Sequence, residues 1–228
     1  MSYTLFIGDQ LFSSWSLRGW LMLQKFNLPF TTKMVGLYSG TLQQDLEALA
    51  PARLVPVLRT PEGHVVGESL AIAETLAERH PDIDMWPNDP GLRSRARWLC
   101  AEMASSFSAL RGECPMQLSH VNAGFTPSQK VLEDVERVEE IWQAARRLSG
   151  AENGWIFDTF SLADVFFAPV AARIVGFNLQ VSDEAARYCL NWMEDPDMQE
   201  WRRQGLRKTY DPFPYPTFEP LKPWPGDG

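Results

Sequence analysis

The sequence contains little cysteine and little histidine. Its 228 residues include three of each. The cysteines are far apart and form no Cys-x-x-Cys pair; they are Cys100, Cys114 and Cys189. This spacing argues against a dithiol redox centre and against a zinc site of the usual kind. The histidines are just as scattered, so we expect no metal, and we expect thiols that stay reduced in the cytoplasm.

Long apolar runs and an excess of positive charge are also missing. No apolar stretch approaches the roughly 20 residues that a membrane-spanning helix needs, and the N-terminal segment lacks the basic flank of a signal peptide. The net charge of −8 argues against general binding to nucleic acids or to anionic membranes. Apolar residues make up 45% of the chain, as is ordinary for a globular protein. We therefore expect neither a nucleic acid nor a membrane as partner.

The first 80 residues alternate between strand and helix patterns. Runs rich in β-formers predict strands over 4–7, 30–35, 55–59 and 64–66. Apolar residues at helical spacing predict helices over 14–25, 42–49 and 69–79. The predicted order is β-α-β-α-β-β-α, which indicates a compact α/β sandwich.

The rest of the chain has helical patterns and no convincing strand pair. Capping boxes and apolar spacing predict helices over 92–110, over 126–150, after 161–164, from 182 and from 195. The tail beyond residue 212 is rich in proline and is expected to be extended.

A stretch rich in proline and aspartate separates these two parts of the chain. It covers residues 81–90, and we interpret it as an interdomain linker. The predicted domains are therefore 1–80 and 91–228, each long enough to form its own core.

Two short motifs carry the most information about function, Val55-Pro56 and Glu68-Ser69. Proline has no N–H and fits badly inside a sheet. A cis bond here would turn the N–H and C=O of Val55 outward, where they can pair with an extended ligand. Glu68 and Ser69 open a predicted helix, whose free N–H groups attract a carboxylate. The motifs predict a site for a peptide-like anion; the alternative is that Pro56 ends an edge strand and Ser69 caps a helix.

Four segments, in their order and spacing, resemble a cytosolic glutathione S-transferase over roughly residues 3–210. They are Phe12-Ser13-Ser14-Trp15-Ser16-Leu17-Arg18, Leu54-Val55-Pro56-Val57, Glu68-Ser69-Leu70-Ala71-Ile72-Ala73-Glu74 and Ser161-Leu162-Ala163-Asp164. The serine-rich first segment is most similar to the zeta-like branch of this family, whose pattern is Ser-Ser-Cys-Ser-x-Arg. Trp15 stands where that branch has cysteine, which weighs against zeta-type isomerase activity.

The resemblance implies an α/β thioredoxin-like N-terminal domain followed by an all-α C-terminal helical domain. It also implies glutathione as co-substrate, a small hydrophobic electrophile as second substrate, and no metal. A cytoplasmic homodimer with a role in detoxification is the expected form of such a protein.

The resemblance further implies which residues bind the thiol of glutathione. A free thiol has a pKa near 8.5, and lowering it by about two units takes roughly 2.7 kcal/mol of preferential anion stabilisation. A serine hydroxyl and a helix N-terminus each supply part of this. Ser13 is the expected hydroxyl partner of the thiolate, with Ser14 and Ser16 as competing candidates and Trp15 beside them. At least one of these serines is also expected to cap the helix.

The other glutathione contacts implied by the resemblance lie at the two motifs. Val55, next to Pro56, is expected to pair its backbone with the cysteinyl part of glutathione. Glu68 is expected to bind the γ-glutamyl ammonium group, and Ser69 the γ-glutamyl carboxylate. The expected activity is that of a glutathione transferase. The alternatives are a glutathione-dependent isomerase or peroxidase, or a non-catalytic regulatory or binding protein with the same fold.

Overall fold

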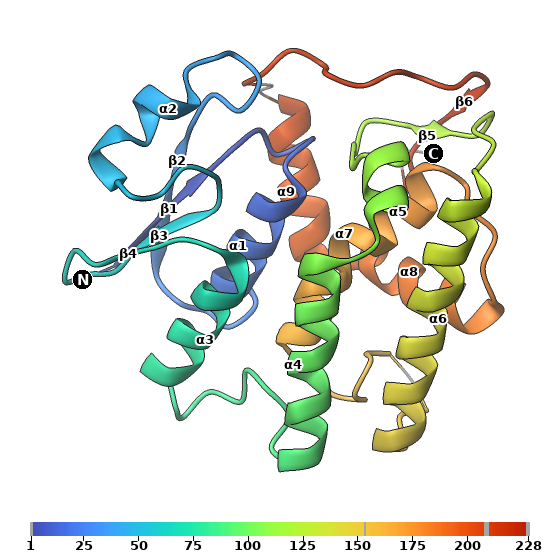
Figure 1. The fold of residues 1–228 in the computed structure, drawn as a ribbon, viewed down its shortest axis with the longest axis horizontal. Helices are drawn as coiled ribbons and strands as arrows, with labels where there is room; N and C mark the ends of the chain where they lie inside the picture. Colours follow the sequence, from blue (N-terminus) through green and yellow to red (C-terminus); the bar gives the residue numbers. More distant parts are fainter. Residues whose placement is uncertain (1, 153, 208–209, 227–228) are drawn as a thin grey trace. The chain divides into compact units, whose positions relative to one another are not determined.

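The computed structural model describes residues 2–152, 154–207 and 210–226, and its contacts divide the chain into two compact units (Figure 1). Unit 1 comprises Met1–Ile83 and Pro196–Pro216, and unit 2 comprises Asp84–Asp195 and Thr217–Gly228. This differs from the expected division, which assigned everything from 91 to 228 to one helical domain. The segment Pro196–Pro216 belongs to unit 1 because its helix packs on the N-terminal sheet domain. Within the described residues, no helix combines the length and hydrophobicity needed to cross a bilayer.

The first 80 residues have the predicted order of strands and helices, and unit 1 adds a helix from the far end of the chain. Its elements are β1 (Tyr3–Ile7), α1 (Ser14–Gln24), β2 (Phe30–Met34), α2 (Leu42–Asp45), η1 (Glu47–Leu49), β3 (Val57–Arg59), β4 (Val65–Val66), α3 (Ser69–Arg79) and α9 (Pro196–Arg207). The sheet has the order β2-β1-β3-β4, with β1 parallel to β2 and antiparallel to β3. Helices α1 and α3 pack against each other, as the predicted α/β arrangement requires.

Helix α9 completes the core of unit 1 by packing against α1 (Figure 1). The ring centroid of Trp201 lies 5.4 Å from that of Trp20 in α1. Both side chains are almost fully buried. Two tryptophans of this size contribute strongly to core stability, so α9 is an integral part of this unit.

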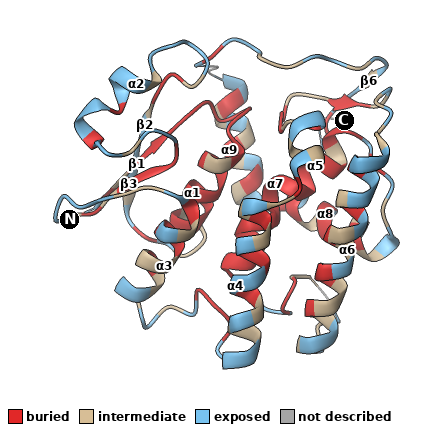
Figure 2. Cartoon of the chain, in the orientation of Figure 1, coloured by how far each residue is buried: buried red, intermediate tan, exposed pale blue. Residues whose placement is uncertain are grey.

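Unit 2 consists mainly of helices around one central helix. Its elements are α4 (Pro90–Ser105), α5 (Ser108–Glu113), β5 (Val121–Asn122), α6 (Gln129–Ser149), α7 (Leu162–Gly176), α8 (Asp183–Glu194) and β6 (Leu221–Lys222). Helix α7 is buried along nearly its whole length (Figure 2). Its sequence is apolar on all sides, and such a helix must lie at the centre of a domain.

Several helix ends lie where the sequence predicts them. Ser161 and Asp164 form the predicted capping box at the start of α7. Gly150 ends α6 in the left-handed conformation with φ of 70°, which glycine adopts without strain. Ser182 caps α8 by accepting a hydrogen bond from the N–H of Ala185 at 3.3 Å.

Three predicted helices have wrong bounds. The helix expected over 42–49 is divided into α2 and η1. The helix expected over 92–110 is two helices, because Phe107 has a φ of 58° and interrupts the chain between α4 and α5. The capping box expected at 126–129 does not form. Ser128 is instead the N-cap of α6, and its Oγ accepts the N–H of Val131 at 3.3 Å.

A short strand pair in unit 2 also corrects the expectation of none. Strands β5 and β6 pair antiparallel, with Val121 opposite Lys222 and Asn122 opposite Leu221. The Oδ1 atom of the fully buried Asn122 accepts the N–H of Phe218 at 3.0 Å. Each strand has two residues, too few for any alternating pattern to be visible in the sequence.

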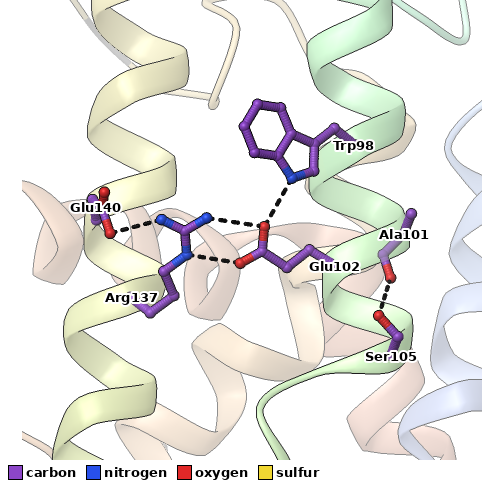
Figure 3. Close-up of polar contacts among 6 residues, drawn as sticks. All are labelled: Trp98, Ala101, Glu102, Ser105, Arg137 and Glu140. Atoms are coloured by element: carbon purple, nitrogen blue, oxygen red, sulfur yellow. Dashed lines mark hydrogen bonds and ion pairs between the residues drawn. The ribbon is translucent and has the colours of Figure 1, made fainter.

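Helices α4 and α6 are joined by an ion-pair network (Figure 3). The Nε and Nη2 atoms of Arg137 donate to the two carboxylate oxygens of Glu102, at 2.7 and 3.2 Å. Trp98 donates its Nε1–H to Glu102 at 2.9 Å, and Arg137 also contacts Glu140 at 2.7 Å. Hydrogen bonding to Arg137 holds the pKa of Glu102 below its usual range. The network fixes the spacing of the two helices on one face of unit 2.

Candidate active site

The sheet register brings the predicted site residues to one edge of unit 1. Strand β1 ends at Ile7, and its Phe6 lies opposite Val57 of β3. The antiparallel pairing therefore places Val55 and Pro56 beside the end of β1 and the loop that follows it. Leu58 lies opposite Val66 of β4, so the chain leaving β4 runs toward the same edge, where α3 begins. Three segments that are distant in sequence thus meet at this edge: residues 8–16, 55–56 and 67–69.

Ser13 and Ser16 form a buried chain of hydrogen bonds at the start of α1. Ser13 is the N-cap, and its Oγ accepts the N–H of Ser16 at 3.3 Å. The Ser13 hydroxyl donates to Ser16 Oγ at 2.7 Å, and Ser16 Oγ accepts the N–H of Gly8 at 2.9 Å. Ser14 is the first residue of the helix and is also buried. The capping role expected of one serine falls to Ser13, whose hydroxyl hydrogen can rotate to a different acceptor.

Trp15 is half-buried and carries the guanidinium of Arg18 over its ring. The Cζ of Arg18 lies 4.3 Å from the ring centroid, a cation–π contact. Arg18 Nη1 also donates to the backbone oxygen of Ser14 at 3.3 Å. Arg18 is almost fully buried. The bulky residue at position 15 therefore takes part in ordering the first turn of α1.

The Val55–Pro56 peptide bond is cis, the form in which the N–H and C=O of Val55 are expected to face a ligand. In the described part of the chain, no hydrogen bond engages the backbone N–H or C=O of Val55. Pro56 is buried against α1, where a Cβ added to Gly19 would lie 2.8 Å from the Cβ of Pro56. Only glycine fits at that position without a shift, so the backbone of α1 packs directly against the ring of Pro56.

Glu68 and Ser69 form the start of α3 in an unusual backbone conformation. Glu68 is the N-cap residue with φ of 60° and ψ of 124°, a region that costs a non-glycine residue about 1–3 kcal/mol. Its side chain is exposed and makes no capping hydrogen bond. The side chain of Ser69 is buried. A first turn that its N-cap side chain leaves uncapped presents N–H groups to an anion.

The protein's own thiols are poor candidates for a reactive centre. All three cysteines are free and buried. Burial raises the pKa of Cys114 and of Cys189 to about 12 in each case. Such thiols stay protonated and unreactive at neutral pH. Among the described residues, no group of three or more histidine, cysteine or acidic side chains is placed to hold a metal.

Two hollows in the structure are lined by other residues. An open groove of about 1160 Å³ in unit 1 runs along α2 and η1 and reaches Arg53. A cavity of about 10 Å³ in unit 2, lined by Trp142 and Tyr188, has room for a single water. None of the predicted site residues lines either hollow, so the candidate site rests on the geometry of its backbone and hydroxyl groups.

Asp9 is a site-forming residue that the motifs do not single out. It is fully buried in the loop that leads from β1 to Ser13. Its backbone oxygen accepts the N–H of Ser13 at 2.8 Å, and its Oδ1 accepts the N–H of Leu11 at 2.8 Å. A single acidic residue after a strand is too common a pattern to predict this role.

A mixed sheet that gathers two helix N-termini and a cis-proline at one edge, with a separate helical unit, defines the glutathione S-transferase fold. The family described as glutathione S-transferase, N-terminal domain, matches residues 12–79. A probable maleylacetoacetate isomerase of Caenorhabditis elegans is 32% identical over 173 residues, which are 74% of this chain and 77% of that protein. The maleylacetoacetate isomerase of Rattus norvegicus is 27% identical over 150 residues, 61% of this chain and 62% of that protein. The chain belongs to the glutathione S-transferase family.

Solved structures agree with this assignment. A glutathione transferase homolog from Burkholderia gl BGR1, solved with bound glutathione, has a TM-score of 0.68 and 27% identity, and the match covers 91% of this chain and all 100% of that one. Glutathione transferase Omega 2S from Trametes versicolor, in complex with 2,4-dihydroxybenzophenone, has a TM-score of 0.64 and 17% identity over 91% of this chain and 98% of that one. The second likeness concerns the fold alone.

Proposed function

We propose that this protein is a glutathione-dependent enzyme that holds the thiolate of glutathione at the edge of the unit 1 sheet. There it directs the thiolate at a small hydrophobic electrophile. The observation that carries the proposal is the convergence of the α1 start, the cis Val55–Pro56 segment and the α3 start. It is supported by the Burkholderia homolog, which was solved with bound glutathione.

The groups at this edge match the chemistry of the γ-glutamyl and cysteinyl parts of glutathione. The exposed Glu68 carboxylate takes the γ-glutamyl ammonium, and the first-turn N–H groups of α3 with the Ser69 hydroxyl take the γ-glutamyl carboxylate. The backbone of Val55 pairs with the cysteinyl unit in the manner of an added strand. Pro56 and Trp15 shape the walls on either side of the thiol.

The hydroxyls at the start of α1 stabilise the thiolate. Ser13 turns its hydroxyl hydrogen from Ser16 to sulfur, and Ser16 donates to Ser13 in return, so the two hydroxyls act in series. A hydrogen bond to a charged group contributes about 1.5–3 kcal/mol, and the helix N-terminus about 0.3–1 kcal/mol. Their sum covers the roughly 2.7 kcal/mol that a pKa lowered by two units requires.

Two reactions use this thiolate, and they differ in what happens to glutathione. In a transfer, sulfur bonds to an electrophilic carbon, a halide leaves, and glutathione is consumed. In an isomerisation, sulfur adds to a carbon–carbon double bond, the resulting single bond rotates, and elimination restores both double bond and glutathione. The transfer is our first proposal. The isomerisation is the second candidate because the two relatives named above are maleylacetoacetate isomerases.

One assay separates these reactions. The purified protein is incubated with glutathione and, in parallel, with a reactive aryl halide and with a cis-alkene dicarboxylic acid. Thioether formed one-for-one with lost glutathione indicates the transferase; cis-to-trans conversion with glutathione conserved indicates the isomerase. Ser13→Ala is expected to slow either reaction at neutral pH because it raises the thiol pKa, while Ser149→Ala, a serine at the end of α6, serves as the matched control. Binding of glutathione with no turnover of any electrophile would refute both and favour a binding protein.

We also propose that the protein is a cytoplasmic homodimer. Three free cysteines support a reducing compartment. The family resemblance supports the homodimer. Sedimentation equilibrium tests this, and a monomeric mass at micromolar concentration would contradict it.

A further inference from the structure

The loop that carries Ser13 is held by the far end of the chain. Asp9 Oδ2 accepts the backbone N–H groups of Tyr210 and Asp211, at 2.6 and 3.1 Å. The same carboxylate accepts the N–H of Leu11, and the backbone oxygen of Asp9 accepts the N–H of Ser13. One fully buried residue therefore connects the C-terminal segment, through its carboxylate, to Ser13, through its backbone oxygen.

Helix α9 contacts the same loop from a second direction. Trp201 donates its Nε1–H to the backbone oxygen of Gln10 at 2.6 Å. A Cβ added to Gly205 would lie 2.9 Å from the side chain of Leu11, so the helix backbone lies directly on the loop. Gln10 Nε2 also donates to Gln204 Oε1 at 2.7 Å. These contacts are too close and too directional to leave the loop free to move without α9.

The segment of residues 210–216, which we term the strap, continues across the loop after β2. Asp211 Oδ2 accepts the N–H of Leu37 at 3.0 Å, and the hydroxyls of Tyr215 and Tyr38 are 2.6 Å apart. Phe213 packs edge-to-face on Phe12, the residue before Ser13, with centroids 5.3 Å apart. The strap thus contacts both the loop that follows β1 and the loop that follows β2.

We propose that Asp9 is a positioning residue for thiolate formation and that the strap and α9 act through it. This rests on the proposed function. Asp9 does not touch glutathione; it fixes the backbone at Ser13 so that the Ser13 and Ser16 hydroxyls and the start of α1 face the sulfur together. The C-terminal segment is then part of the glutathione site of unit 1, although it is distant in sequence.

The test measures the thiol pKa of bound glutathione by the ultraviolet absorbance of the thiolate, together with the pH profile of turnover. Asp9→Asn keeps the shape but replaces one accepting oxygen by an NH2 group, so that either the N–H of Leu11 or those of Tyr210 and Asp211 lose their acceptor. We expect the bound thiol pKa to rise by about one unit, so turnover falls about tenfold below that pKa. The loss should shrink at higher pH, where thiolate forms without help, and glutathione affinity should change less than about twofold.

Two further variants make the test specific. Asp164→Asn is the matched control, because Asp164 is another fully buried aspartate that accepts two backbone N–H groups, and it should leave the thiol pKa unchanged. Phe213→Ala with Tyr215→Ala loosens the strap without altering Asp9 and should shift the thiol pKa in the same direction by less. This second variant decides the matter if Asp9→Asn does not fold.

The outcomes separate the two proposals. Wild-type protein that binds no glutathione thiolate would refute the proposed function and this inference with it. A normal wild-type thiolate that neither Asp9→Asn nor the strap variant changes would refute the inference alone. An equal shift in Asp164→Asn would also refute it, because the effect would then reflect general loosening of the fold.

Discussion

Replacing Ser16 by alanine separates structural from chemical roles at the start of α1. Ser16 Oγ is fully buried and accepts the N–H of Gly8 and the hydroxyl of Ser13. Its removal leaves the buried Gly8 N–H without an acceptor, which costs about 1–3 kcal/mol. Ser13→Ala instead removes an N-cap, which costs about 1 kcal/mol. Ser16→Ala should therefore be the more destabilising of the two.

The order reverses for the pKa of the bound thiol. Ser13 donates directly to sulfur, so Ser13→Ala removes about 1.5–3 kcal/mol and raises the thiol pKa by about one to two units. Ser16 acts only by polarising Ser13, an effect of about 10–30% of one hydrogen bond, so Ser16→Ala should raise the thiol pKa by less than about 0.7 unit. Urea unfolding gives the stability, and absorbance titration gives the thiol pKa.

If Ser13 donates to sulfur and Ser16 supports it, Ser16→Ala has the larger effect on stability and Ser13→Ala has the larger effect on the thiol pKa. If Ser16→Ala shifts the thiol pKa more than Ser13→Ala does, the direct donor has been misassigned. If Ser14→Ala gives the largest shift, the role belongs to Ser14, and the Ser13–Ser16 pair is structural.

The remaining predictions concern other residues. Glu68→Gly should relieve the strain of the positive φ and stabilise the protein by about 1 kcal/mol, while weakening glutathione binding about tenfold. Glu68→Gln should weaken binding without a gain in stability. Thermal melts measure the stability, and calorimetry measures the binding. Burial raises the pKa of Asp164 to about 6 from 3.8, so its contribution to stability is complete below about pH 4 and is lost as the pH rises through about 6. The difference in unfolding free energy between the wild type and Asp164→Asn should therefore fall by about 3 kcal/mol between about pH 4 and pH 6. Urea unfolding at several pH values measures this difference. A difference that does not change with pH would contradict the prediction. Glu102→Gln should cost about 1 kcal/mol in low salt and less in high salt, because the side chain of its partner Arg137 is 38% exposed.

The order of elements in unit 1 is predictable because each element has a local signal. The sequence predicts α3 to its first and last residue, since Ser69 begins the apolar spacing and the chain after Arg79 leads to a proline. A proline in a strand pattern marks Val55–Pro56 as a break in the sheet, although it does not by itself determine that the bond is cis. Local chemistry is sufficient for these features.

Features that depend on distant contacts are not predictable in the same way. The membership of α9 in unit 1 depends on Trp201 and Gly205 meeting the loop after β1, and the hydrogen bond from Trp201 to Gln10 spans 191 residues. Asp9 has no motif of its own, and its role is visible only through hydrogen bonds to Tyr210 and Ser13. Hydroxyls at both 126 and 128 fit a helix start, and only tertiary packing selects Ser128.

Glutathione is proposed to bind at the edge where α1, β3 and α3 meet. Calorimetric titration of the purified wild-type protein with glutathione at neutral pH tests this proposal most directly. We expect saturable binding in the micromolar to low-millimolar range, about −8 to −4 kcal/mol, weakened by Glu68→Gln. No saturable heat at several temperatures would contradict it.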